Sequence, residues 1–370
     1  MGRRKTNTPQ GGELSSMRIA VVSHAGTPLS PTTPSKARKL IQGGGAIPKR
    51  DTLGTFYIQL TTPTAEHIPH DTVVGVDPGK RYSGVAVQTP QATLWMGHLV
   101  LPFPGVKQGM KTRTHLRRGR RYRKTPQRPV RFFHRTGHKI PPSIKANRAL
   151  EWRVRQELRK IYPITHVAYE VVKAHGTKSF SPVMGGQQWQ MDRIAEPWPL
   201  EPRRGWETAQ LRFALGLAKT SQKSERSPAS HAVDGVALAS GHFVHYTDYC
   251  TPTEYGKRWE GTCQITDAPF AIIQRPQWFR RVLHVQNPAP GGLRKRKGGT
   301  VTPYGVRKGD WAEATKAGKV VRGYICGYTT GKLSLADARW HRIGQFVVSQ
   351  VRLLRRSTRL LIDAVPSAHC

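Results

Sequence analysis

The chain has 370 residues, of which 60 are lysine or arginine and 22 are aspartate or glutamate, so its formal net charge is +38. A charge of this size excludes most enzymes of small-molecule metabolism and indicates a polyanionic partner, either nucleic acid or an anionic membrane surface. The mean hydropathy is −0.53, and no apolar run approaches the roughly 20 residues that span a bilayer. These features favour nucleic acid over a membrane.

The four cysteines, Cys250, Cys263, Cys326 and Cys370, form no CxxC pair. This spacing argues against a zinc knuckle and against a disulfide framework, so a reducing cytoplasm is the expected compartment. Residues 1–16 form a polar, glycine-rich extension without a secretory signal, and a start of translation at Met1 or at Met17 fits the sequence equally.

The N-terminal part is predicted to be a small basic module. A strand over Ile19–Val22 precedes the segment PLSPTTPSKARKLIQGGGA, in which proline and Ser/Thr residues lead into a short basic helix that ends at Gly43–Gly45. From Thr72 onward, TVVGVD, SGVAVQ and TLWMGHLVL predict three successive strands joined by turns, as at the antiparallel start of a mixed sheet.

A long basic stretch follows, with no acidic residue between Asp77 and Glu151. Its centre, KTRTHLRRGRRYRK, is compatible with a helix but is polar on every side, so it has no face to bury. It is either a solvated linker or a helix that lies against phosphates. The charge density favours the second interpretation, because like charges at i+3 and i+4 destabilise a helix unless anions neutralise them.

The middle of the chain is predicted to contain two helices and one strand around a loose connection. ANRALEWRVRQELRKI has helical apolar spacing, and ITHVAYE predicts a strand that ends at Glu170. Residues 171–204 are predicted to be loop or poorly packed connection, followed by a helix near Thr208–Lys219. HAVDGVALA predicts a short helix with His231 and Asp234 on one face.

The composition changes again beyond His245, where VVRGYICGYTTGKLSLA predicts short strands of a small barrel-like domain. The last segment, RIGQFVVSQVRLLRRSTRLLI, has one apolar and one basic face and is predicted to be an amphipathic helix.

Three carboxylates are placed where acidic residues are structurally awkward. Asp77 and Glu170 end strands, and Asp234 is on a helix of small residues. Carboxylates that converge from separate elements can hold two Mg²⁺ ions for phosphodiester hydrolysis; the alternative for each one is an ion pair with arginine. His231, three residues before Asp234, is either a helix-capping group or a general base. The DPG turn at Asp77 also occurs at the phosphate-binding hairpin of actin-like and sugar-kinase ATPases. The high positive charge of the chain argues against a kinase.

The segments VVGVDPGKRYSGVAV, HVAYE and SHAVDGVALA resemble the three split motifs of RuvC-type nucleases. Lys111–Lys124 matches the arginine-rich bridge helix that follows the first motif, and PLSPTTPSKARKLIQGGGA resembles the PLMP module of IscB and IsrB, the insertion-sequence-encoded relatives of Cas9 ancestors. The C-terminal run from RRVLHVQNPAPGG to HRIGQF is similar to their C-terminal region. Two departures are Ser30 in place of methionine and Gly235 in place of alanine.

The choice between the two relatives rests on the interval from residue 171 to residue 230. IscB carries an HNH nuclease there, whereas these 60 residues contain a single histidine, His175, and no asparagine. The chain therefore resembles IsrB, and the resemblance implies a nuclease with one catalytic centre.

The implied fold is α/β, an RNase H-like (RuvC) mixed sheet split by an arginine-rich bridge helix, with a small N-terminal PLMP module and a C-terminal basic β-rich domain. The implied domains are, in order, a polar extension (1–16), the PLMP module (17–68), RuvC-I (69–104), the bridge helix (105–135), RuvC-II (136–190), the connection with RuvC-III (191–245), an RNA-interacting segment (246–284) and a C-terminal domain that contacts the flanking motif (285–370).

The implied activity is nicking of the non-target strand of a guide-matched duplex beside a short flanking motif. Asp77, Glu170 and Asp234 would hold two Mg²⁺ ions, for which Mn²⁺ can substitute, and His231 would accept the proton of the attacking water. The implied partners are a structured guide (omega) RNA and double-stranded target DNA, bound by a monomer in a 1:1 ribonucleoprotein of the prokaryotic cytoplasm, close to the nucleoid. The residues expected to contact RNA or DNA are Lys36, Arg38, Lys39, Lys111, Arg113, Arg117, Arg118, Arg120, Arg121, Arg123, Lys124, Arg294, Lys295, Arg296 and Lys297.

Two alternatives share the basic composition. One is a non-catalytic RNA-binding scaffold, which has no need of all four site residues. The other is a RuvC-type resolvase that acts without a guide, against which the N-terminal module and the bridge segment count.

Overall fold

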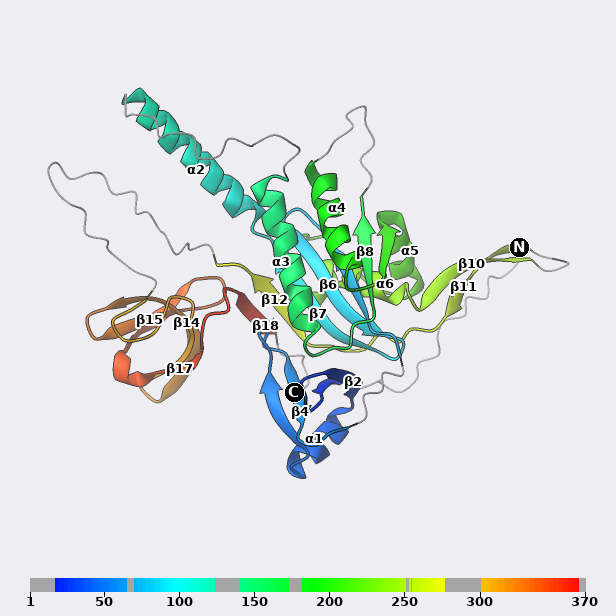
Figure 1. Ribbon diagram of the computed structural model, residues 1–370, viewed down its shortest axis with the longest axis horizontal. Helices are drawn as coiled ribbons and strands as arrows, with labels where there is room; N and C mark the ends of the chain where they lie inside the picture. The colour runs from blue at the N-terminus through cyan, green and yellow to red at the C-terminus, as the bar shows by residue number, and fades with distance from the viewer. Residues whose placement is uncertain are drawn as a thin grey trace. The chain divides into compact units, whose positions relative to one another are not determined.

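The computed structural model describes residues 17–64, 70–123, 140–172, 182–250, 253, 255–276 and 301–365. The chain divides into two compact units, Met1–Ile272 with Ala364–Cys370, and Ile273–Asp363 (Figure 1). Within the described ranges, no helix is both long enough and apolar enough to cross a membrane.

The first unit begins with a small sheet of four strands in the order β2-β1-β4-β3. Its elements are β1 (Ile19–Val22), β2 (Pro28–Thr32), α1 (Pro34–Gln42), β3 (Ala46–Arg50) and β4 (Phe56–Leu60). Thr33 caps α1 by accepting a hydrogen bond from the backbone N–H of Lys36 at 3.3 Å. The predicted strand and short basic helix of this module are confirmed.

The main sheet has the strand order β18-β12-β7-β6-β5-β8-β9. Its strands are β5 (Val73–Asp77), β6 (Tyr82–Thr89), β7 (Ala92–Val100), β8 (His166–Val171), β9 (Leu200–Arg204), β12 (Phe270–Gln274) and β18 (Leu361–Val365). β5, β6 and β7 form an antiparallel meander, whereas β8 runs parallel to β5 and β9 runs parallel to β8. The sheet is therefore mixed, as predicted.

Helices cover both faces of this sheet. They are α3 (Pro142–Leu158), α4 (Pro182–Ala195), α5 (Gly205–Ala214) and α6 (Val233–Ser240), whereas α2 (Phe103–Tyr122) contacts α3. Neighbouring residues of β6 show the two faces, because the side chain of Ser83 lies near Glu151 of α3 and lowers its pKa, while Gly84 lies against the backbone of His231, just before α6. α3 thus packs on one face (Figure 1) and α6 on the other.

The prediction of a loose connection over residues 171–204 is wrong, because this range contains α4 and β9. Sequence periodicity is weak in α4, which buries Gly186, Gln190 and Ile194 rather than a continuous apolar stripe. A Cβ on Gly186 would lie 2.3 Å from Ile144 of α3, so the missing side chain allows the two helices to approach closely. The helix predicted near Thr208–Lys219 exists as α5 but ends at Ala214.

A two-stranded hairpin, β10 (Val244–Cys250) with β11 (Tyr255–Gly261), follows α6. The second unit then forms an antiparallel sheet in the order β16-β15-β14-β13-β17. Its strands are β13 (Trp311–Lys316), β14 (Lys319–Thr329), β15 (Lys332–Ala336), β16 (Arg342–Val347) and β17 (Val351–Arg355).

The sheet of the second unit confirms the short strands predicted there, and Ile325, Leu335 and Phe346 are part of its core. The amphipathic helix predicted at the C-terminal end is wrong. That segment forms β16, a short 3₁₀ turn and β17, and exposure alternates along β17 with the period of a strand.

Candidate active site

Two neighbouring parallel strands bring two of the predicted carboxylates to the same end of the main sheet. Asp77 is the last residue of β5, and Glu170 is the second-last residue of β8. Val76 pairs with Tyr169 in the parallel register, so Asp77 and Glu170 are at equivalent depths on adjacent strands. A π-helical turn (Pro228–Ala232) and α6 then add His231 and Asp234 at this end.

Glycines allow α6 to lie directly on the sheet. A Cβ on Gly75 of β5 would lie 1.9 Å from the carbonyl oxygen of Gly235, and a Cβ on Gly84 would lie 1.7 Å from that of His231. A Cβ on Gly235 would itself come within 2.9 Å of the backbone of Ala86. Gly235, the residue where the resemblance expects alanine, is thus one of the positions that set the distance between α6 and β6.

His231 is held by hydrogen bonds at both ring nitrogens. Nδ1 lies 3.2 Å from Oδ2 of Asp77, and Nε2 lies 3.2 Å from the carbonyl oxygen of Lys223. A carbonyl can only accept, so Nε2 carries a proton, and because an ionised carboxylate also only accepts, the hydrogen bond at Nδ1 requires a second proton between Nδ1 and Asp77. The ring also packs beside Tyr82 and His98, at centroid distances of 5.6 and 5.5 Å. These contacts fix the plane of the ring.

Asp234 is almost fully buried and pairs with two cations. Oδ1 accepts from Arg212 of α5 and Oδ2 from Lys219, in the loop after α5. Both cationic side chains are partly exposed, with relative accessibilities of 22% and 32%, whereas that of Asp234 is 3%. Sequence reasoning missed both cations, because no local spacing relates them to α6.

Glu170 is turned toward α5. Its Oε2 accepts a hydrogen bond of 2.7 Å from the hydroxyl of Thr208. Burial raises the pKa of Glu170, and the negative charges of Asp77 and Asp234 raise it further. Asp77, His231 and Asp234 have ligand atoms within 4.8 Å of one another. The structure therefore brings these three predicted residues together and leaves Glu170 beside them.

This donor set fits a divalent cation. Three carboxylates approach one another closely enough for two of them to raise the pKa of the third, and a cation between them would relieve that repulsion. Carboxylate oxygens are the ligands that Mg²⁺ prefers. Asp77, Asp234 and Glu170 are thus the residues that would hold it.

The turn after Asp77 is held from the other face of the sheet by α3. Asn147 donates to the carbonyl oxygen of Lys80 at 2.9 Å, and Arg148 donates to that of Gly79 at 3.3 Å. Arg148 also donates to both carboxylate oxygens of the fully buried Glu151 at 2.7 Å. This buried ion pair positions the backbone that carries Asp77.

The predicted nucleic-acid contacts are on two exposed helix surfaces. Lys36, Arg38 and Lys39 are exposed on α1. Lys111, Arg113, Arg117, Arg118 and Arg121 are exposed on α2, and Arg123 is exposed just after it. Arg120 is in α2, but its side chain lies outside the described residues, as do Lys124, Arg294, Lys295, Arg296 and Lys297. The basic segment is helical as far as Tyr122, in α2, while its role as a bridge helix and its contact with RNA stay predictions.

A cavity of about 790 Å³ lies between α2 and α3, next to the turn that follows Asp77. Pro78 and Gly79 line it on the side of the active site, together with cationic and apolar side chains that include Lys107, Arg118 and Phe103. Cations beside apolar surface are what a nucleic-acid strand meets in many binding grooves.

A family model described as RRXRR protein matches residues 19–191, and the chain contains the run RRGRR at positions 117–121, in α2. No curated protein matches the chain.

Two solved structures of RuvC from Thermus thermophilus are similar to the chain. One, in complex with a Holliday junction substrate, shares 16% identity, covers 47% of this chain and 92% of the RuvC chain, and gives a TM-score of 0.26. The other, of RuvC, shares 16% identity, covers 46% and 92%, and gives a TM-score of 0.23.

Proposed function

We propose that the chain is an RNA-guided, metal-dependent DNA endonuclease similar to IsrB, which nicks the non-target strand of a guide-matched duplex beside a short flanking motif. One observation carries the proposal: Asp77, His231 and Asp234 converge, with Glu170 beside them, at one end of a mixed sheet in a chain of net charge +38. The match to the RRXRR family, which is associated with IscB- and Cas9-like proteins, supports it.

Asp77, Asp234 and Glu170 are the ligands in this proposal, and two Mg²⁺ ions are the cofactors. Bound divalent ions supply stabilisation of the charge on the phosphodiester oxygens and lower the pKa of water. The hydrogen bond from Thr208 keeps Glu170 oriented at the edge of the site. Asp77 also contacts His231. In this proposal the same carboxylate therefore binds the metal ions and orients the base.

His231 is the general base, and its basic atom is Nδ1. The carbonyl of Lys223 keeps a proton on Nε2; with a metal ion on Asp77 in place of this contact, Nδ1 of the neutral ring would be free to accept the proton of the attacking water. Packing beside Tyr82 and His98 holds the ring in this orientation. His231 would take the proton of the water at Nδ1 as the phosphorus–oxygen bond forms.

Arg212 and Lys219 have a second role in this proposal. They neutralise Asp234, and their partial exposure lets them turn toward solvent while the carboxylate stays buried. A guanidinium and an ammonium that leave Asp234 are close to the place where the phosphates of a DNA strand would lie. We assign them to binding of the scissile strand.

The guide RNA would lie along the exposed cations of α2 and α1. Within the described part of the chain, none of the ion pairs involves Lys111, Arg113, Arg117 or Arg118. Unneutralised cations on an exposed helix are suited to phosphates. In this proposal pairing between guide and target supplies the sequence specificity, and the domain over 285–370 reads the flanking motif.

The test is strand-resolved cleavage of a supercoiled target by the protein co-expressed with its neighbouring RNA. We expect nicking of the non-target strand only, complete loss in EDTA, and a fall of roughly 10³-fold or more in rate for Asp77→Asn with binding of guide and target retained. Asp192→Asn, which changes an exposed carboxylate on α4, is the matched control and should cleave normally. Loss of guide and target binding in Asp77→Asn would contradict the assigned role.

One observation favours a non-catalytic RNA-binding scaffold instead. Asp234 is paired with two cations, as a purely structural carboxylate would be. A bound RNA without cleavage at any Mg²⁺ or Mn²⁺ concentration would establish the scaffold. Cleavage that persists when the RNA is removed would indicate a resolvase that needs no guide.

A further inference from the structure

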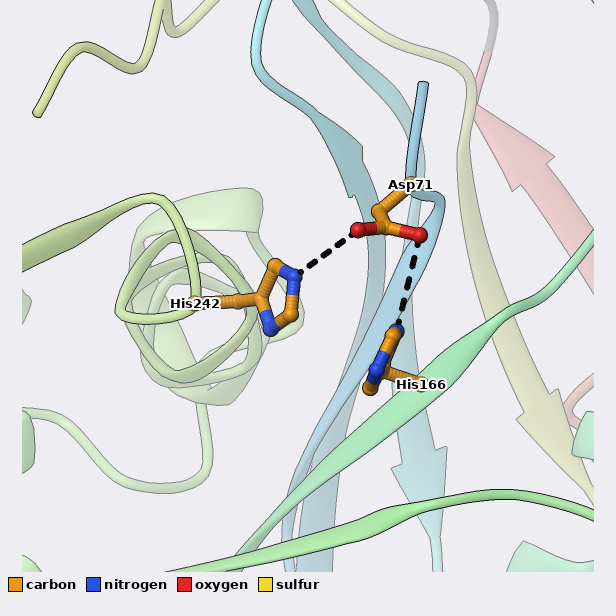
Figure 2. A group of neighbouring side chains, drawn as sticks. All are labelled: Asp71, His166 and His242. Carbon is orange, nitrogen blue, oxygen red and sulfur yellow. Dashed lines mark hydrogen bonds and ion pairs between the residues drawn. The ribbon is translucent and has the colours of Figure 1, made fainter. Parts of the chain in front are cut away.

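A second cluster of side chains lies at the other end of the same strands. Asp71 is two residues before β5, His166 is the first residue of β8, and His242 is two residues after α6. Figure 2 shows the two imidazole rings on either side of the Asp71 carboxylate. Nε2 of His242 lies 3.3 Å from Oδ2 of Asp71, and Nδ1 of His166 lies 3.7 Å from Oδ1.

These distances match the spacing of ligands around a small ion. Bonds of about 2.0–2.1 Å in a tetrahedral site place the ligand atoms about 3.4 Å apart. The three ligand atoms here lie within 4.8 Å of one another, so small side-chain movements would close the set. Asp71 is 47% exposed, and this exposure leaves an open position for water and a path of entry for an ion.

A neighbouring carboxylate orients His242 as metal-binding histidines are commonly oriented. Nδ1 of His242 hydrogen-bonds Glu201 of β9, which leaves Nε2 directed at Asp71. Glu201 is in turn bound at 2.9 Å by Arg203, which also donates to the carbonyl of Gly241 at 2.7 Å. Such a carboxylate fixes the tautomer and the ring orientation of a ligating histidine.

The pairing of Asp71 also points to a cation. Its ion pairs within the described residues are with His166 and His242 alone, although the chain has 60 lysines and arginines. A carboxylate that served only to anchor the structure would have many permanent cations available. Two imidazoles and one carboxylate are instead a donor set suited to Zn²⁺ and similar transition ions, whereas Mg²⁺ prefers oxygen donors alone.

We propose that Asp71, His166 and His242 bind a divalent transition-metal ion of the Zn²⁺ class, which ties β5, β8 and α6 together at the end of the sheet opposite the candidate active site. Each of these elements contributes to both ends. The ion would therefore stabilise the frame that holds the catalytic carboxylates without taking part in cleavage. The inference does not depend on the proposed nuclease activity.

The first measurement is metal content. The full chain, with any RNA that purifies with it, is stripped with chelator and dialysed against Zn²⁺ in excess Mg²⁺, which saturates the oxygen-ligand site. We expect wild type to retain about one equivalent of Zn²⁺ more than Asp71→Asn or His166→Gln. His245→Gln is the matched control, because His245 is exposed and lies 3.9 Å from Glu260; it should retain the full amount.

A variant that keeps three metal-binding side chains tests whether misfolding explains the loss of the ion in Asp71→Asn. Asp71→His replaces the carboxylate with a third imidazole and should retain the ion that Asp71→Asn loses. In wild type, Zn²⁺ should also raise the unfolding temperature by a few degrees, and Co²⁺ should give the visible absorption of a tetrahedral nitrogen–oxygen site. Equal metal content in wild type, Asp71→Asn and His166→Gln would overturn the proposal and leave the cluster as an ion-pair clamp.

Discussion

The same three elements, β5, β8 and α6, contribute side chains at both of their ends, but the donor atoms differ between the two ends. At the C-terminal ends of the strands, carboxylates predominate, and Asp234 is neutralised by the partly exposed Arg212 and Lys219. At the N-terminal ends, Asp71 is flanked by two histidines, one of which is fixed by Glu201. The first arrangement suits hard ions and phosphate, and the second suits a softer ion.

The difference is also seen in two histidines. Burial lowers the pKa of His98, beneath the active site, to about 4, with His231 and Arg226 adding to the effect. At the opposite end, the hydrogen bond to Glu201 raises the pKa of His242. One frame thus keeps a neutral histidine beside the candidate catalytic residues and places a histidine between two carboxylates at the far end. Because α6 connects both ends, its seating on the sheet should control both.

The largest effect is therefore expected from Gly75→Ala. A Cβ at this position would lie 1.9 Å from the carbonyl oxygen of Gly235 and 2.7 Å from the amide nitrogen of Ala239, so α6 would have to move. We expect a loss of stability of about 3 kcal/mol or more, measured by denaturant unfolding, together with loss of both nicking and Zn²⁺ retention.

Gly109→Ala, in α2, is the control, because its Cβ would meet no heavy atom within 4 Å and alanine favours a helix. Its stability should be unchanged or slightly higher. If Gly75→Ala lost one function and kept the other, the two ends would not be coupled through α6.

The sequence predicted the active-site end better than the histidine end, for a topological reason. Buried apolar runs located β5 and β8, and the carboxylates that follow such runs identified Asp77 and Glu170. His231 and Asp234 are three residues apart, so helical spacing alone placed them together. Asp71, His166 and His242 are far apart in the chain, and only the parallel pairing of β5 with β8 and the length of α6 bring them into contact.

The errors in the predicted fold have local physical causes. The sequence of α4 indicates a loop because the residues that the helix buries include Gly186 and the polar Gln190 and so form no apolar stripe. The C-terminal segment predicts a helix because its leucines and arginines occur in pairs, Leu353-Leu354 and Arg355-Arg356, a spacing that also fits a helical turn. Pairing of β17 with β13 decides for the strand. Tertiary contacts of this kind leave little trace in a short stretch of sequence.

A smaller effect, confined to the active-site end, is expected from His98→Leu. Both ring nitrogens of His98 are buried without a hydrogen-bond partner within the described structure. Because its pKa falls from 6.5 to about 4 on folding, the unfolded chain binds more protons between these values, and stability is lost as the pH falls through this window.

At pH 5 this loss amounts to about 2 kcal/mol in wild type, and His98→Leu should not show it. The measurement is the difference in unfolding free energy between the two proteins at pH 7 and at pH 5. Parallel pH profiles would show that His98 is not kept neutral in the folded protein.

The smallest effect is expected from Lys219→Gln, which tests how the active-site end is neutralised. The ammonium group of Lys219 occupies Oδ2 of Asp234 and so competes with a divalent ion for that oxygen. Removing it should lower the Mg²⁺ concentration for half-maximal nicking a few-fold, roughly 1 kcal/mol or less for a partly exposed ion pair.

Two variants are the controls. Lys219→Arg keeps the charge and should leave that concentration nearly unchanged. Lys160→Gln, which removes a surface lysine paired with Glu157, controls for net charge. An unchanged Mg²⁺ requirement in Lys219→Gln would mean that the ion does not use this oxygen of Asp234. Arg212 and Lys219 would then be permanent partners of Asp234, and the active-site end would be as fixed as the end that carries His166 and His242.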